Sequence, residues 1–188
     1  MELLLGIFSA FGLSASAGLN AYIPLFTIAV IAHYTDWFKL KAPYDGLSNP
    51  WIMVLLGVLI IIEFLADKIP AFNHFNDLLQ TFVRPVAGAI VFAASAKVLT
   101  GVSPALSLAC GLLIAGSVHI VKAGVYRPAV TATTGGVGNI PVSIAEDFVA
   151  TVTSLLAVIV PVIVACLLVL VTALLLWWLI RRRQARAI

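Results

Sequence analysis

The stretch SASAGLNAYIP, from Ser14 to Pro24, interrupts the first long apolar run of the chain with small residues, an asparagine and a proline. A second stretch, TATTGGVGNIP from Thr131 to Pro141, has the same layout. Aligned without a gap, the two glycine-bearing stretches share alanine, glycine, isoleucine and proline at four of eleven positions. Because glycine and proline disfavour the interior of a regular helix, we expect each stretch to break a helix.

The composition around these stretches is typical of an integral membrane protein. Hydrophobic residues make up 62% of the 188 residues and charged residues only 10%, whereas a soluble domain contains about 25% charged residues. We therefore expect a single transmembrane domain, residues 1–188, with no appended soluble catalytic domain. No lysine or arginine precedes Lys39, so the first apolar run lacks the basic start of a signal peptide and is expected to remain.

The apolar residues fall into five blocks without the period-two alternation of barrel strands, which predicts an all-α, polytopic helical fold with about five spans. The blocks are Leu3–His33, Trp51–Ala66, Pro85–Leu99, Ala105–Val121 and Phe148–Ile180. The third block is short for a span. The fifth is too long for a straight span, and Pro161 is expected to kink it.

The two glycine-bearing stretches allow two interpretations. Three blocks lie between them, and an odd number of spans would insert the second copy upside down. Inverted repeats with broken or re-entrant elements are characteristic of transporters, and Asn20 and Asn139 would then bond to the freed backbone. Alternatively, small residues four apart, such as Ser14 and Gly18, form a tight helix-packing face. Both interpretations stay open at this stage.

Residues Ala71 to Pro85 predict an amphipathic helix, because apolar and polar residues each recur at helical spacing. Phe72, Phe75, Leu79 and Phe82 form the apolar face. We expect this helix to lie on the membrane surface or over the mouth of a cavity.

Four acidic residues are candidates for ion coupling. Glu63 and Asp67 are four residues apart and share a helix face after a long apolar run, where a carboxylate is costly unless paired or hydrated. Alternatively, Glu63 and Asp67 mark an ordinary helix end at the membrane interface, an interpretation that Pro70 supports. Glu146 and Asp147 follow the second glycine-bearing stretch, where they either favour a helix N-terminus or form a proton or cation site.

Basic residues form a second set of candidates. His119, Lys122 and Tyr126 occur at i, i+3 and i+7, so they are expected on one helix face, with Arg127 beside them. Together with Arg84 they would suit an anionic group. Alternatively, these basic residues would pair with the four carboxylates. Both arrangements are possible in one protein if the carboxylates neutralise the basic residues until an anionic substrate enters.

Several function classes are disfavoured. Cys110 and Cys166 lie inside apolar runs and predict neither a disulfide nor a metal site. No catalytic or phosphate-loop motif is present, so we expect no cofactor and no metal, and enzyme activity is not the favoured interpretation. The C-terminal RRRQAR, residues 181–186, is expected to contact anionic lipid rather than nucleic acid and to place the C-terminus in the cytoplasm.

Four motifs, in this order along nearly the whole chain, resemble a bacterial membrane family catalogued as domain of unknown function 4126. They are SASAGLNAYIPL, EFLADKIP, TFVRPVAGA and HIVKAGVYRPAVTATTGGVGNIPVSIAEDF. The resemblance implies that the motifs form one polar centre, and it implies no activity or substrate.

The sequence thus predicts a small transporter or channel of the inner membrane, for an anionic or lipid-phosphate-like substrate and coupled to a proton or cation. A homo-oligomer such as a dimer, surrounded by lipid, is expected. The alternatives are an assembly factor that binds a partner membrane protein, or an intramembrane lipid-modifying enzyme. The substrate-binding candidates are Asn20, Arg84, His119, Lys122, Arg127 and Asn139, and the ion-coupling candidates are Glu63, Asp67, Glu146 and Asp147.

Overall fold

A computed structural model describes residues 2–36, 39–67, 70–98, 103–160, 167, 170–174 and 177–178, and these residues contain helices and no strand. The all-α prediction is therefore confirmed for this part of the chain. The helices are α1 (Glu2–Leu19), α2 (Tyr22–Tyr34), the short 3-10 helix η1 (Asp45–Ser48), α3 (Pro50–Ala66), α4 (Pro70–Val98), α5 (Pro104–Val121), the π-helix η2 (Lys122–Tyr126), α6 (Arg127–Thr134) and α7 (Asn139–Ile159). The predictions for Pro161, Cys166 and the C-terminal arginines concern residues outside the described part of the chain.

Three described segments are long and apolar enough to cross a membrane, namely Leu78–Ala96, Pro104–Thr134 and Asn139–Ile159. Three shorter apolar helices accompany them, at Gly6–Leu19, Tyr22–Tyr34 and Pro50–Ala66. The length and apolar composition of these helices are those of an integral membrane protein. The expected count of about five spans stays a prediction, because the shorter helices do not reach the length of a full span.

Helix α4 differs from the sequence-based expectation. The segment 71–85 and the short apolar block that follows it form one continuous helix of 29 residues, with Pro85 inside it. The helix predicted over residues 71–85 is confirmed, but it is not separate from the block that follows. Its place on the membrane surface or over a cavity mouth stays a prediction. The helix continues past the proline because Ala87, Val91 and Ala94 are buried in the core, and this packing offsets the hydrogen bond that proline removes.

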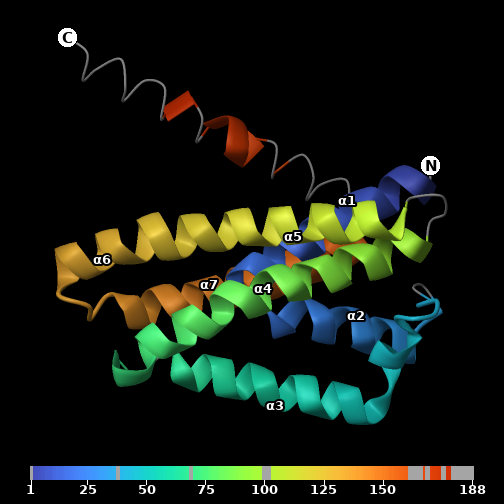
Figure 1. Ribbon diagram of the computed structural model, residues 1–188, viewed down its shortest axis with the longest axis horizontal. Helices are drawn as coiled ribbons and strands as arrows, with labels where there is room; N and C mark the ends of the chain where they lie inside the picture. The colour runs from blue at the N-terminus through green and yellow to red at the C-terminus, as the bar shows by residue number, and fades with distance from the viewer. Residues whose placement is uncertain are drawn as a thin grey trace.

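Helix α1 is the centre of the bundle and packs against α4, α5 and α7. Figure 1 shows α5 and α6 running end to end as one rod along one side, with α3 at the opposite edge. Small residues allow α1 to approach its neighbours closely. A Cβ added at Gly18 would lie only 2.6 Å from the carbonyl oxygen of Ala115 in α5, so the backbones of α1 and α5 nearly touch there.

The two glycine-bearing stretches both break a helix, but in different surroundings. The first separates α1 from α2 at Asn20 and Ala21, both buried. Its serines bond to neighbouring helices. The Ser14 hydroxyl donates to the Gly111 carbonyl oxygen in α5 over 2.9 Å, and the Ser16 hydroxyl donates to the Ala150 carbonyl oxygen in α7 over 2.8 Å. The first stretch is thus both a packing face and a break.

The second stretch is a turn between α6 and α7. Gly135 and Gly136 have positive φ angles of 64° and 92°, a region that side chains with a Cβ rarely adopt. Most residues of this turn are exposed. The inverted relation between the two stretches stays a prediction, because breaks at both places do not by themselves establish a repeat.

Candidate functional site

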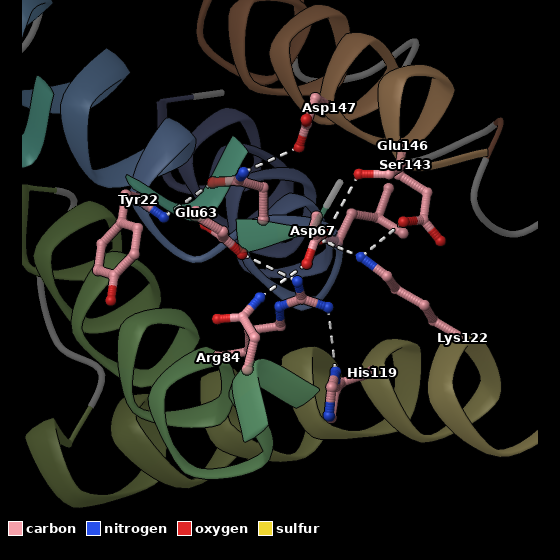
Figure 2. Close-up of polar contacts among 12 residues, drawn as sticks. Tyr22, Glu63, Asp67, Arg84, His119, Lys122, Ser143, Glu146 and Asp147 are labelled. Carbon is pink, nitrogen blue, oxygen red and sulfur yellow. Dashed lines mark hydrogen bonds and ion pairs between the residues drawn. The ribbon is translucent and has the colours of Figure 1, made fainter. Parts of the chain in front are cut away.

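A cluster of charged side chains lies buried where the helices meet. We call it the polar cluster and define it by Glu63, Asp67, Arg84, His119, Lys122, Arg127 and Glu146, each at most 8% exposed. Figure 2 shows the labelled members pointing toward one another from different helices. The sequence separates them by up to 83 positions (146 − 63), so only the helical packing brings them together.

One arm of the cluster joins α3, α4 and α5. Arg84 Nη2 donates to Glu63 Oε1 over 2.9 Å, and both side chains are almost fully enclosed. Arg84 Nη1 lies 3.2 Å from Nδ1 of His119, whose Nε2 lies 3.1 Å from the Thr81 hydroxyl. Because a guanidinium only donates, Nδ1 accepts, and His119 is a neutral ring with its proton on Nε2.

The other arm joins the end of α3 to α6 and α7. Arg127 Nη2 donates to Asp67 Oδ2 over 2.8 Å and to Glu146 Oε2 over 3.0 Å. The Ser143 hydroxyl adds a bond of 3.1 Å to the same Asp67 oxygen, and Asn76 donates to the other one over 2.7 Å. Asp67 thus accepts from three elements, α4, α6 and α7.

The break between α1 and α2 faces this arm. At the end of α1, Lys122 Nζ donates to the Leu19 carbonyl oxygen over 2.8 Å and also bonds to Glu146 Oε2 over 2.8 Å. At the start of α2, Asn20 Oδ1 accepts from the backbone N–H groups of Tyr22 and Ile23. Asn20 Nδ2 donates to Asp147 over 2.9 Å. A cation therefore lies at the carbonyl end of α1, and an acid near the amide end of α2, as the helix dipoles favour.

The π-helix η2 corrects the predicted face of α5. Tyr126 was expected beside His119 and Lys122, but its side chain is 52% exposed, whereas Arg127 is 5% exposed. A π turn contains one residue more than an α turn. The residue after Tyr126 therefore takes the inward position, and Arg127 joins the polar cluster.

Asn139 does not join the cluster. Its Nδ2 donates to the hydroxyl of Thr131 over 2.8 Å, across the exposed turn between α6 and α7. Its Oδ1 has no hydrogen-bond partner among the described residues, so Asn139 does not accept from freed backbone as Asn20 does. The other site residues expected from the sequence are members of the polar cluster, except Asn20 and Asp147, which bond to each other beside it.

The family model for the Domain of unknown function (DUF4126) matches residues 7–182. The chain belongs to this family. Neither a curated protein nor a solved structure matches it.

Three residues of this DUF4126 chain that touch the cluster were not anticipated as site residues. They are Asn76, Thr81 and Ser143. Asn76 and Ser143 could have been found from the sequence. Asn76 lies eight positions before Arg84, with Gln80 midway, and this spacing places all three on one face of a helix. Ser143 lies three positions before Glu146 on one face of α7. Thr81 could not have been found in this way, because a single threonine in a helix is common.

The bonding of the DUF4126 cluster is incomplete. Glu63 Oε2 and Glu146 Oε1 are buried and have no hydrogen-bond partner among the described residues. A buried carboxylate oxygen without a donor is costly, and a proton, a cation or water removes that cost. The described residues contain no group of three or more side chains suited to a metal ion.

Proposed function

We propose that the chain is a small transporter of the inner membrane that moves an anion together with a proton. One observation carries the proposal: Glu146 Oε2 is bonded to both Lys122 and Arg127, while its Oε1 has no partner. Ionisable groups buried within membrane-spanning helices are costly and mark pathways for protons and ions. Internal salt bridges that stabilise the fold alone leave no reason for an unbonded carboxylate oxygen.

The ion pairs supply a mechanism for coupling. Arg84, Lys122 and Arg127 each bond to a carboxylate, so an entering anion competes with that carboxylate. Protonation of Glu146 removes its negative charge, so Lys122 and Arg127 each lose one ionic partner and can bond to the anion, while Arg127 stays paired with Asp67. One proton and one monovalent anion then enter together, and the buried charge does not change. This conservation of charge avoids the large cost of an uncompensated buried ion.

The proposal includes the direction of the chain and its assembly. We expect the C-terminus in the cytoplasm, because of the arginines at residues 181–186. We also expect a homo-oligomer such as a dimer. A phosphate-bearing lipid headgroup is one anion of the right chemistry, since the planar guanidinium of Arg127 suits a bidentate phosphate.

Proton-coupled anion entry can be tested in sealed proteoliposomes that contain a pH-sensitive dye. The probe is dimethyl phosphate, a monoanion with no titratable proton near neutral pH, and methanesulfonate serves as a comparison. We expect added dimethyl phosphate to acidify the interior, and Glu146→Gln to abolish the acidification. Thr133→Ala, on the exposed side of α6, is the matched control and should transport normally.

A structural role is the second candidate, because each cation of the cluster is already paired. It predicts that neutral variants lower thermal stability and that neither anion causes acidification dependent on Glu146. A lipid-modifying enzyme would instead leave an altered lipid, which mass spectrometry of the extracted vesicles would detect.

A further inference from the structure

The ammonium of Lys122 lies where a free cation would bind. Its Nζ is 2.8 Å from the Leu19 carbonyl oxygen, at the C-terminal end of α1, and 2.8 Å from Glu146 Oε2. In broken-helix transporters, the carbonyl ends of half-helices are the groups that coordinate Na⁺. The lysine is 4% exposed, so this site is closed to bulk solvent.

The oxygens around the ammonium are held in place before any ion binds. Gly18 lets α1 approach α5 so closely that a Cβ there would lie 2.6 Å from both the Ala115 carbonyl oxygen and Val118 Cβ. Asn20 fixes the start of α2 by accepting from two backbone N–H groups. The Leu19 carbonyl lies between these two fixed points. Its position thus depends on the packing of α1 rather than on Lys122.

A third oxygen is available at the same place. Glu146 Oε1 is buried and has no hydrogen-bond partner in the described part of the chain. Together with Glu146 Oε2 and the Leu19 carbonyl oxygen, it gives three oxygens, one negative charge and no thiol or imidazole, which suits a hard monovalent cation. Arg127 also contacts Glu146 Oε2, so the site tolerates only one further positive charge.

We propose that Lys122 occupies a built-in binding site for a monovalent cation, and that Na⁺ takes the site when the side chain is withdrawn. Replacement of the ammonium by Na⁺ leaves the charge of the polar cluster unchanged. The natural chain therefore carries its cation covalently and needs no sodium. The cation site deepens the proposed function, because it excludes Na⁺ as the coupling ion. Only this statement about coupling rests on the proposed function.

The test measures cation binding by the purified full-length chain in detergent. Thermal unfolding of Lys122→Ala is compared in sodium chloride and in choline chloride of equal ionic strength, because choline is too large for the site. We expect Na⁺ to raise the Tm of Lys122→Ala by about 3 °C or more and to saturate with concentration. The natural chain should shift by less than about 1 °C, because the Lys122 ammonium already occupies the site.

Two controls separate a specific site from general salt effects. Lys122→Met fills the space with an apolar chain and should show no Na⁺ response. The double variant Lys122→Ala with Glu146→Gln removes the charged ligand and should lose the response. If Lys122→Ala does not fold in choline, Lys122→Ser is used, because its hydroxyl adds a ligand, and both variants should be recovered when purified in Na⁺.

The proposal is overturned if folded Lys122→Ala and Lys122→Ser show no Na⁺ response, if neither folds in Na⁺, or if the natural chain responds as strongly as the variants do. The thermal shift reports binding without transport. The anion transport proposal can therefore fail in vesicles while the cation site stands, and the reverse also holds.

Discussion

Arg84 donates to Nδ1 of His119 across 3.2 Å, and this bond makes His119 a neutral hydrogen-bond acceptor within the polar cluster. A protonated ring would carry a proton on Nδ1 and point it at the guanidinium. In this arrangement Nδ1 therefore carries no proton, and the single ring proton lies on Nε2. Its function is to position Arg84, whose other amino group bonds to Glu63, and to connect that arginine to Thr81 on the same helix.

The first prediction concerns this acceptor. His119→Leu leaves a buried Arg84 donor without its partner, which costs about 1–3 kcal/mol, so we expect a Tm lower by several degrees. His119→Asn keeps an acceptor oxygen near the position of Nδ1 and should lose less. Thermal unfolding of the two purified variants checks the order. Equal losses would show that the Arg84 bond contributes little.

The second prediction concerns Arg127, which bonds to Asp67 and Glu146 at once. Arg127→Met leaves two buried carboxylates close together, and removal of one member of a buried pair costs about 3–5 kcal/mol. We expect little folded protein by size-exclusion chromatography. Arg127→Met combined with Asp67→Asn keeps the buried charge balanced, because Lys122 stays paired with Glu146, and this double variant should recover the folded peak. A double variant that stays aggregated would contradict the electrostatic explanation.

The third prediction concerns the pair Glu63 and Arg84. Both are fully buried, so each single variant, Glu63→Gln or Arg84→Gln, should lower the Tm strongly. The double variant should be more stable than the sum of the two losses predicts, with a coupling of about 1–3 kcal/mol. Additive losses in this double-mutant cycle would mean that the two side chains do not interact in the membrane.

The fourth prediction concerns access of water to the two glycine-bearing stretches. Cys110 and Cys166 are first replaced by serine, and single cysteines are placed at Ala17 or Thr134. Ala17 is fully buried and Thr134 is exposed, so a membrane-impermeant thiol reagent should label only Thr134→Cys in sealed vesicles. Labelling of Ala17→Cys in a folded protein would show that α1 lines a water-filled path in another state.

The fifth prediction compares two glycines. Gly18→Ala places a Cβ 2.6 Å from the Ala115 carbonyl oxygen, so α1 and α5 must separate. Overpacking of this kind costs about 1–3 kcal/mol, and a lower Tm should follow. Gly124→Ala meets nothing within 4 Å and serves as the matched control. A neutral Gly18→Ala would mean that the contact between these helices is looser than described.

Much of the site was predictable from the sequence, because ionisable residues in an apolar chain are rare. Glu63 and Asp67 stood out by their spacing after an apolar run, and Arg84 and Arg127 by their positive charge near apolar segments. The sequence does not show which of these residues pair with each other across the fold. That Arg84 bonds to Glu63 while Arg127 bonds to Asp67 and Glu146 depends on how the helices pack, which periodicity does not encode.

Two features were mispredicted for identifiable physical reasons. Pro85 and the polar residues before it indicated a boundary, but the core packing of the alanines after it outweighs the missing hydrogen bond, and α4 continues. The position of Tyr126 was extrapolated with a regular α-helical period. No residue type in KAGVY, residues 122–126, distinguishes a π turn from an α turn.

We expect the chain to tolerate a change of length at this π turn. Because the turn contains one residue more than an α turn, removal of one residue there need not displace the side chains beyond Tyr126. Deletion of Gly124 would restore an ordinary helical repeat and still leave His119, Lys122 and Arg127 aligned at i, i+3 and i+7. We thus expect the reading frame to lose a whole codon there at little cost, whereas the exchange of one buried member of the polar cluster should destabilise the fold.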